Sequence, residues 1–119
     1  MTKQEIIKET AEFYNLGNRG KNGGDTHMCQ YLSSEGNMCA VGRCIIPEKL
    51  EDFVEVYNSL RVISISDLEF YLQPQYRGHS LAFWNDLQHF HDHPTNWTEE
   101  GLSEHGIQGR VLLESAYRD

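Results

Sequence analysis

The stretch HMCQYLSSEGNMCAVGRCII, residues 27–46, holds all three cysteines of the chain and decides how the fold is read. Two apolar-leaning runs, 27–32 and 38–46, flank the polar segment SSEGN at 33–37. A five-residue connection of this kind predicts a β-hairpin in which a glycine or asparagine takes the positive-φ position. If the strands pair about that turn, Cys29 and Cys39 lie roughly opposite each other and could pack together or share a ligand.

Length and composition predict one globular domain over residues 1–119. Charged residues make up 24% of the chain and hydrophobic residues 39%, which is a globular rather than a disordered balance. No apolar run approaches the ~20 residues needed to cross a bilayer, so no membrane association is expected. We also see no charged-then-apolar leader, and we expect a cytoplasmic protein. Three cysteines in a reducing compartment favour free, buried thiols over a disulfide framework.

The net charge of -8 bears on the choice of partner. Direct binding to nucleic acid is not expected, because neutralising phosphates requires clustered lysine and arginine. An acidic surface favours solubility and attracts a protein with a basic surface.

Periodic apolar residues predict four to five helices around the hairpin. The expected segments are residues 2–16, capped by Thr2, a helix that begins at Pro47, residues 66–72, residues 81–92, capped by Ser80, and a last stretch that Thr98 caps, with a break between about 105 and 109. The run LRVISI at 60–65 predicts a third strand. We therefore expect an α+β fold, in which a small β-hairpin or three-stranded sheet packs against these helices.

The helix that begins at Pro47 is divided into two faces. Leu50, Phe53, Val54 and Tyr57 form an apolar stripe, and the other face is acidic. Its four carboxylates are Glu48, Glu51, Asp52 and Glu55. Such a row is typical of a solvated surface, but it could equally present an acidic patch to a partner.

The loop at 17–25 has four glycines and two cations, Arg19 and Lys21. The spacing does not match a P-loop, because Lys21 is followed by asparagine. Anion binding and a flexible connection both remain open for this loop.

Cysteine and histidine are ligands that zinc prefers, and the chain offers several. They are His27, Cys29, Cys39, Cys44, His89, His91 and His93. Their spacing contains no C-x2-C knuckle. His89 and His93 have the i, i+4 spacing of a helical pair, but we expect Pro94 to unwind that turn. No cofactor is therefore expected, and structural zinc stays an alternative.

Two interpretations compete for the residues His91 and Asp92. In the first, Cys29 or Cys39 is a thiolate nucleophile activated by His91. Adjacent helical side chains diverge by about 100°, so Asp92 is not expected to hold His91 in a triad. In the second, which we prefer, His91 bonds a backbone group of the hairpin from the edge of the core, and Asp92 fixes the loop at 95–97.

Two motifs in the chain resemble those of a known family. Residues 29–42 read C-x-Y-x4-G-x2-C-A-V-G, with Tyr31 at the aromatic position, and residues 87–92 read L-Q-x-x-H-D. This pairing is similar to a family of small proteins of phages, prophages and bacterial genomes. The resemblance implies a phage-type accessory protein and no particular reaction. It also implies that Cys29, Cys39, His91 and Asp92 form one unit, with Cys44 outside it.

Three functions follow as hypotheses. The first is a non-enzymatic phage protein that binds a host factor, for example blocking a defence nuclease or a signalling protein in the host cytoplasm. The second is a protein that sequesters a nucleotide signal, with Arg19 and Lys21 meeting phosphates and Tyr31, Trp84 or Trp97 stacking a base. The third is a thiol- or zinc-dependent enzyme that uses Cys29, Cys39 and His91.

Overall fold

The computed structural model describes residues 1–15, 38–57 and 61–117. Its α-helices in these ranges are α1 (Lys3–Phe13), α2 (Pro47–Tyr57), α3 (Leu68–Tyr71), α4 (Leu81–Asp92) and α5 (Glu104–Ala116). Single turns of 3₁₀ helix are η1 (Gly42–Cys44), η2 (Val62–Ser64), η3 (Pro74–Tyr76) and η4 (Pro94–Asn96). One antiparallel hairpin is formed by β1 (Trp97–Thr98) and β2 (Gly101–Leu102). The described part is thus mostly helical with a small two-stranded hairpin, which is compatible with the expected α+β class.

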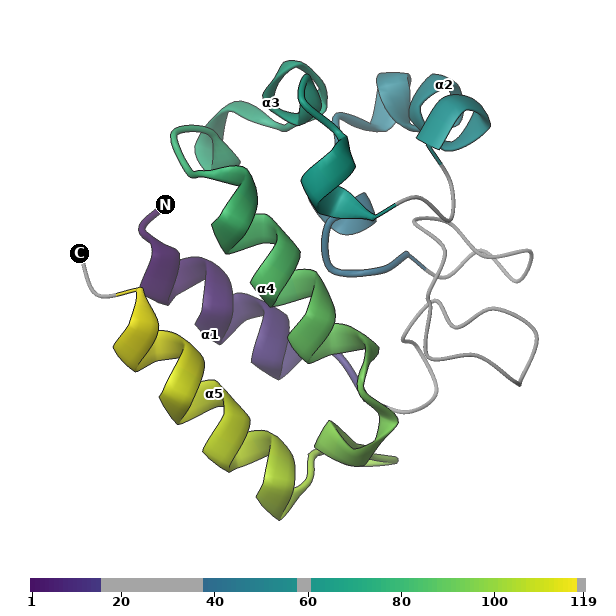
Figure 1. Cartoon of the computed structure of the whole chain (residues 1–119). Coiled ribbons are helices and arrows are strands. Elements are labelled where there is room, and N and C mark those ends of the chain that lie inside the picture. The colour runs from purple at the N-terminus through teal and green to yellow at the C-terminus, as the bar shows by residue number, and fades with distance from the viewer. Residues whose placement is uncertain (16–37, 58–60, 118–119) are drawn as a thin grey trace.

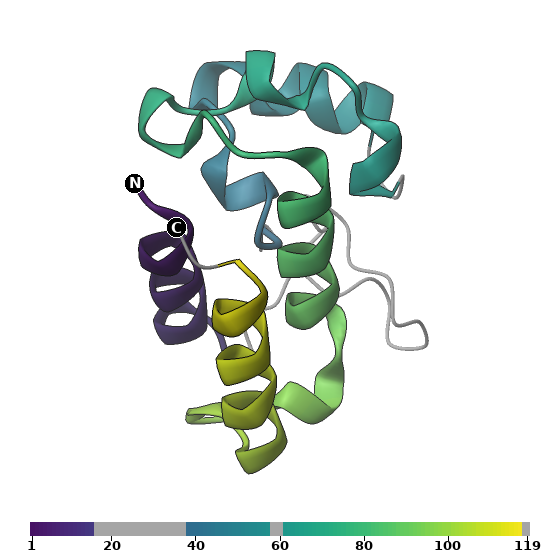
Figure 2. The ribbon, with the colours of Figure 1, turned by 60° about the vertical axis from the view of Figure 1, so that its left-hand side comes forward.

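Helices α1, α4 and α5 pack against one another, and α2 and α3 lie together beyond one end of them (Figures 1 and 2). One cluster of buried side chains joins the two groups, with Ile6 from α1, Phe53 from α2 and Trp84 from α4 among its members. In the part of the chain described here, no helix has the length and apolar character that crossing a membrane requires.

Helix α1 begins where the sequence predicts. The Thr2 side chain accepts a hydrogen bond from the Glu5 amide, and the Glu5 carboxylate accepts one from the Thr2 amide, which completes a capping box. Ile6 and Ile7 are fully buried on the inner face. The helix ends at Phe13, three residues before the predicted end at 16, and Tyr14 follows it with extended backbone.

The helices around the middle of the chain agree with the pattern of apolar residues. Helix α2 begins at Pro47 and buries Phe53, and α4 is capped by Ser80, whose hydroxyl accepts from the Phe83 amide at 3.2 Å. The short helix α3 also forms within the expected residues 66–72, but it begins at Leu68 rather than at 66. Asp67 takes the cap position, with no side-chain hydrogen bond to the helix.

The predicted hairpin at 27–46 is only partly visible, because residues 27–37 lie outside the described residues. Its second half is not the expected strand. The chain turns tightly through η1, where the Cys44 amide donates to the Val41 carbonyl at 2.9 Å, and Ile45 then forms a single antiparallel bridge with Leu72. An apolar run of this length fits a buried turn as well as a strand, because periodicity alone cannot separate the two.

The third strand predicted at 60–65 is also wrong for its described part. Residues 62–64 form η2, which buries Val62 and Ile65 and leaves Ile63 exposed. This three-residue spacing of buried side chains fits a 3₁₀ turn, whose side chains repeat every third residue. Leu60 lies outside the described residues.

The C-terminal helix differs from its prediction in two respects, the residue that caps it and the break expected between about 105 and 109. Thr98 lies in β1, and Ser103 caps α5 by accepting from the Gly106 amide at 3.0 Å. The helix runs unbroken through Gly106 and Gly109. In this helix Leu113 is buried, whereas Val111 and Leu112 are exposed.

The glycine at 106 is needed because α5 passes close to the backbone of η4. A Cβ atom there would lie 2.1 Å from the Asn96 carbonyl oxygen and 2.9 Å from the Leu102 side chain. At Gly109 a Cβ would lie 3.4 Å from the Phe90 ring, an ordinary contact.

We therefore expect Gly106→Ala to lower the free energy of unfolding and Gly109→Ala not to lower it. Gly106→Ala should lower the free energy of unfolding by about 3 kcal/mol, because the backbone of η4 must move away. Gly109→Ala, the matched control, should be neutral or stabilising by up to about 1 kcal/mol through helix propensity. Urea denaturation followed by circular dichroism measures both, and equal effects would contradict the close approach of α5 to η4.

Candidate functional site

The structure describes five of the predicted site residues: Cys39, Trp84, His91, Asp92 and Trp97. The others lie outside the described residues, and they are Arg19, Lys21, Cys29 and Tyr31. Whether Cys29 joins the unit that the two motifs imply therefore stays a prediction.

His91 and Asp92 contact each other at the last turn of α4. The Nδ1 atom of the buried imidazole lies 3.1 Å from Oδ1 of Asp92. The expectation that neighbouring helical side chains diverge too far for this contact is thus wrong. Asp92 ends the helix and its carboxylate folds back along it, within reach of the ring.

Gln88, which the analysis of single residues missed, connects this pair to the segment before η1. Its Nε2 atom donates to Oδ1 of Asp92 at 2.9 Å, and its Oε1 atom accepts from the Val41 amide at 3.1 Å. The signal was present in the L-Q-x-x-H-D motif, where Gln88 precedes Asp92 by four residues and so shares its helix face. Gln88 therefore links α4 to a buried backbone amide.

The loop at 95–97 is fixed to α4 by its own residues. The indole of Trp97 donates to the His91 carbonyl at 2.9 Å, and the Asn96 amide side chain donates to the Phe90 carbonyl at 2.8 Å. These bonds satisfy carbonyls at the C-terminal end of α4. The role that we expected of Asp92 in this loop thus belongs to Asn96 and Trp97.

The imidazole of His91 lies in close aromatic packing. Its centroid is 4.4 Å from that of Tyr14, edge to face, and 6.4 Å from Trp97. The Tyr14 hydroxyl donates to the Met38 carbonyl at 2.6 Å. Burial raises the pKa of Tyr14 well above its ordinary value, and Cys39 nearby adds to this shift. These contacts place His91 inside the core rather than at a surface cleft.

Both described thiols are fully buried and free of disulfides. The Cys44 sulfur donates to the Ala40 carbonyl at 3.4 Å. Burial raises the pKa of Cys44 to about 12, so its thiol is neutral over the physiological range. A neutral thiol without solvent contact is a poor nucleophile, and both sulfurs act as core packing atoms.

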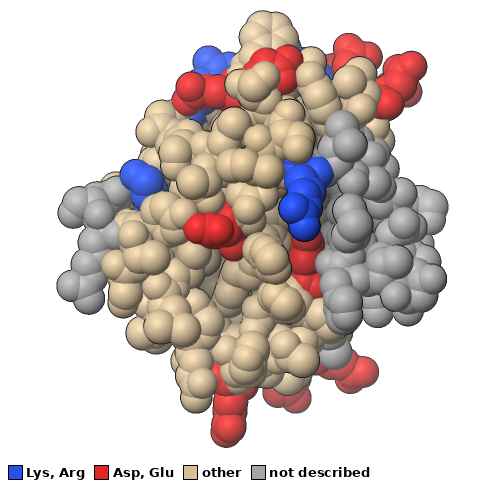
Figure 3. All heavy atoms as spheres, in the orientation of Figure 1, with Lys and Arg blue, Asp and Glu red and all other residues tan. Residues whose placement is uncertain are grey.

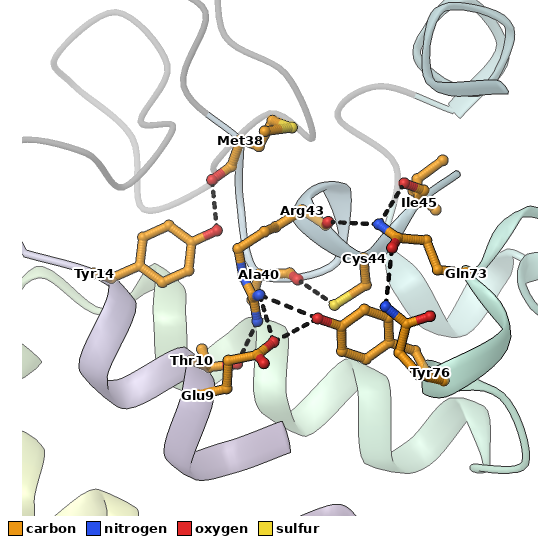
Figure 4. A network of polar contacts seen from close by, with 11 residues as sticks. Glu9, Thr10, Tyr14, Met38, Ala40, Arg43, Cys44, Ile45, Gln73 and Tyr76 are labelled. Carbon is orange, nitrogen blue, oxygen red and sulfur yellow. Dashed lines mark hydrogen bonds and ion pairs between the residues drawn. The ribbon is translucent and has the colours of Figure 1, made fainter. Parts of the chain in front are cut away.

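A second polar cluster, which the sequence analysis did not single out, surrounds Arg43 (Figure 4). Its Nη1 atom donates to the Glu9 carboxylate at 2.6 Å, and its Nη2 atom donates to the Thr10 hydroxyl at 3.4 Å. The Tyr76 hydroxyl donates to the same Glu9 oxygen. The guanidinium also lies 5.3 Å from the centroid of the Phe13 ring. An arginine within the apolar run 38–46 was the signal for this cluster.

The ion pair and hydrogen bonds of the Arg43 cluster connect α1, η1 and η3. Burial alone would raise the pKa of Glu9, but the hydrogen bonds from Tyr76 and Arg43 and the charge of Arg43 outweigh it and hold that pKa below its ordinary value. The side chain of Glu9 is 37% exposed, so solvent weakens this ion pair. The cluster positions helix α1 against η1 and η3.

The tryptophans proposed to stack a base are packed inside the protein. Trp84 is 1% exposed and Trp97 is 3% exposed, so neither ring is open to a ligand in this conformation. Over residues 1–15, 38–57 and 61–117, no three His, Cys, Asp or Glu side chains gather as metal ligands would. The zinc alternative that involves His27 and Cys29 is not tested by these residues.

Comparison with known proteins adds no family at this point. The sequence matches no protein-family model, and no match was found among curated proteins or solved structures. The resemblance to a phage family therefore rests on the two motifs alone.

The burial of the thiols predicts how the cysteines react. In native protein near neutral pH, Cys39 and Cys44 should resist iodoacetamide, while denaturant should make all three thiols of the chain reactive. The Cys29→Ser variant isolates the two described thiols. Intact mass spectrometry of this variant should show no native labelling, and rapid native labelling would restore the thiol-enzyme hypothesis.

The Gln88 bridge predicts a specific loss of stability. Gln88→Leu leaves the buried Val41 amide without its acceptor and should cost about 1–3 kcal/mol of unfolding free energy. Gln108→Leu on the exposed side of α5 is the matched control and should change stability by less than about 0.5 kcal/mol. Chemical denaturation of the two variants makes the comparison, and a Gln88→Leu protein as stable as wild type would show that the bridge is unimportant.

Proposed function

We propose that this chain is a non-enzymatic accessory protein of the phage type, which binds a partner protein with a basic surface. The binding surface that we propose is the outer face of α2, called here the acidic face and made of Glu48, Glu51, Asp52 and Glu55. A bacterial host factor, such as a defence nuclease or a signalling protein, is the class of partner that fits.

The observation that carries the proposal is the one-sided charge of α2. All four carboxylates are exposed, while Phe53 on the opposite side is fully buried. In Figure 3 acidic groups gather along the edge of the molecule where Figure 1 places α2. A row of like charges attracts an oppositely charged surface and accelerates the encounter with it.

The cation within α2 is directed away from this row. The Lys49 ammonium lies 3.8 Å from the centre of the Phe70 ring and donates to the Phe70 carbonyl at 3.4 Å. Its charge is thus engaged with α3.

The acidic face is costly to the isolated helix. Its members are spaced three or four residues apart, so neighbouring carboxylates repel each other by a few tenths of a kcal/mol per pair. Glu55 also lies in the last turn, where the helix dipole disfavours a negative charge. A basic partner would relieve both effects, which is the pattern expected of a binding surface that is not optimised for stability.

The burial of the chemistry-bearing side chains supports the non-enzymatic part of the proposal. Cys39, Cys44 and His91 are each 0% exposed, so a substrate in solution has no contact with them. The surface charge of α2 is therefore the better basis for a function than the core thiols.

Neutralising the acidic face should have opposite effects on stability and binding. The variant Glu51→Gln/Asp52→Asn/Glu55→Gln should be about 0.5–1.5 kcal/mol more stable at low salt, because the repulsive pairs are removed. The same variant should lose salt-sensitive capture of basic proteins from a bacterial host lysate. Denaturation curves and quantitative mass spectrometry of the captured proteins measure the two effects.

The control carries the same change of charge elsewhere. In Glu99→Gln/Glu100→Gln/Glu104→Gln the substitutions lie around the β1–β2 turn and the start of α5, all at exposed positions. This control should capture as wild type does. Equal loss in both variants would point to net charge alone, and no loss in the α2 variant would overturn the proposed surface.

A further inference from the structure

We infer that His89 and His93 form a surface site for a divalent metal of the late first transition row, with Ni²⁺, Cu²⁺ and Zn²⁺ as candidates. The site lies at the C-terminal end of α4, with His89 in its last turn and His93 directly after it, and is independent of the acidic face of α2. It uses two imidazoles as ligands and leaves the remaining coordination positions to water or to a group from another molecule.

The geometry of the two rings carries this inference. Their centroids are 4.9 Å apart and their planes are inclined by 20°, so the imidazoles are stacked side by side. Both residues are exposed. As Pro94 predicts, α4 ends at Asp92, and His93 has extended backbone (φ -76°, ψ 112°) before η4 begins at Pro94. The two rings nevertheless meet at the C-terminal end of α4, one from its last turn and one from its C-cap residue.

The chemistry of the two side chains suits a late transition metal. A metal bound at 2.0–2.1 Å to each of two nitrogens at right angles requires those nitrogens to be about 3 Å apart. The ring centroids of His89 and His93 lie 4.9 Å apart. Imidazole is a ligand that suits nickel, copper and zinc, whereas Mg²⁺ and Ca²⁺ prefer oxygen.

The electrostatic surroundings favour a cation at this position. The last turn of a helix carries the negative end of the helix dipole, and α4 is 12 residues long. The net charge of -8 draws cations to the protein as a whole. The helix dipole and the net charge therefore both favour a divalent cation at this end of α4.

His91, which lies between these two histidines in the sequence, does not belong to this site. His91 is buried, and its Nδ1 atom contacts Asp92. His89 and His93 are both exposed. The histidines of residues 87–93 thus divide into a core residue and a surface pair.

Calorimetric titration of untagged protein with NiCl₂ tests the site. A Cys29→Ser background removes a thiol that could bind metal elsewhere, and MgCl₂ serves as the control ion. We expect one Ni²⁺ per chain near pH 7.5, and an affinity that falls by about tenfold or more in either His89→Ala or His93→Ala, because a chelate becomes a single ligand.

His105→Gln provides the matched histidine control, since His105 is an exposed histidine of α5. This variant should bind Ni²⁺ as the parent does. Paramagnetic broadening of amide signals by Ni²⁺ should centre on residues 88–94. Absence of binding, or binding that survives both alanine substitutions, would overturn the site, and neither result would bear on the acidic face of α2.

Discussion

The described structure depends on the hydrogen bonds that the last two turns of α4 provide to their surroundings. A buried peptide group without a partner costs free energy comparable to a lost hydrogen bond, and irregular segments offer few internal partners. Gln88 supplies an acceptor to the Val41 amide, while Asn96 and Trp97 donate to carbonyls of α4. The segment before η1 and the loop after α4 are therefore held to the same helix from opposite directions.

This arrangement explains why the residues that first suggest chemistry are structural in the described chain. His91 and Cys39 lie where α1, α4 and the segment before η1 meet, and that position is dry. The polar groups there are joined to one another, as the contact of Gln88 and His91 with Asp92 shows. Such buried networks fix one arrangement of a core, and the side chains of His91 and Cys39 within it have no access to solvent. Charge and potential metal ligands are instead found on the outside, on α2 and at the end of α4.

How much of this the sequence could predict depends on the range of the interaction involved. Helix starts at Thr2, Pro47 and Ser80 were predictable, because a cap or a first-turn proline acts within four residues. The structures of 38–46 and 60–65 were not, because an apolar run fits a buried turn as well as a strand until its neighbours are known.

The candidate site shows the same division. The burial of His91 followed from its helix position, but its contact with Asp92 and the role of Gln88 depend on side-chain conformations that spacing does not determine. The sequence predicted a break in α5 because it contains Gly106. This glycine is instead required by the close approach of the helix to the Asn96 carbonyl, which lies outside α5. The informative residue of the L-Q-x-x-H-D motif is Gln88, which connects Asp92 to the Val41 amide. A glutamine is neither a nucleophile nor a common metal ligand, so its residue type alone did not mark it as a site residue.

The packing of α1 against α5 has a consequence for synthesis on the ribosome. Gln4 near the start of α1 donates to the Tyr117 carbonyl at the end of α5, and Figures 1 and 2 show the two helices side by side. Helix α1 is synthesised before α5, so the part of its inner face that packs on α5 stays uncovered until α5 has left the exit tunnel. Vectorial translation leaves Ile6 and Ile7 exposed in the nascent chain during that interval, so early protection by a chaperone would be of most use at this N-terminal segment.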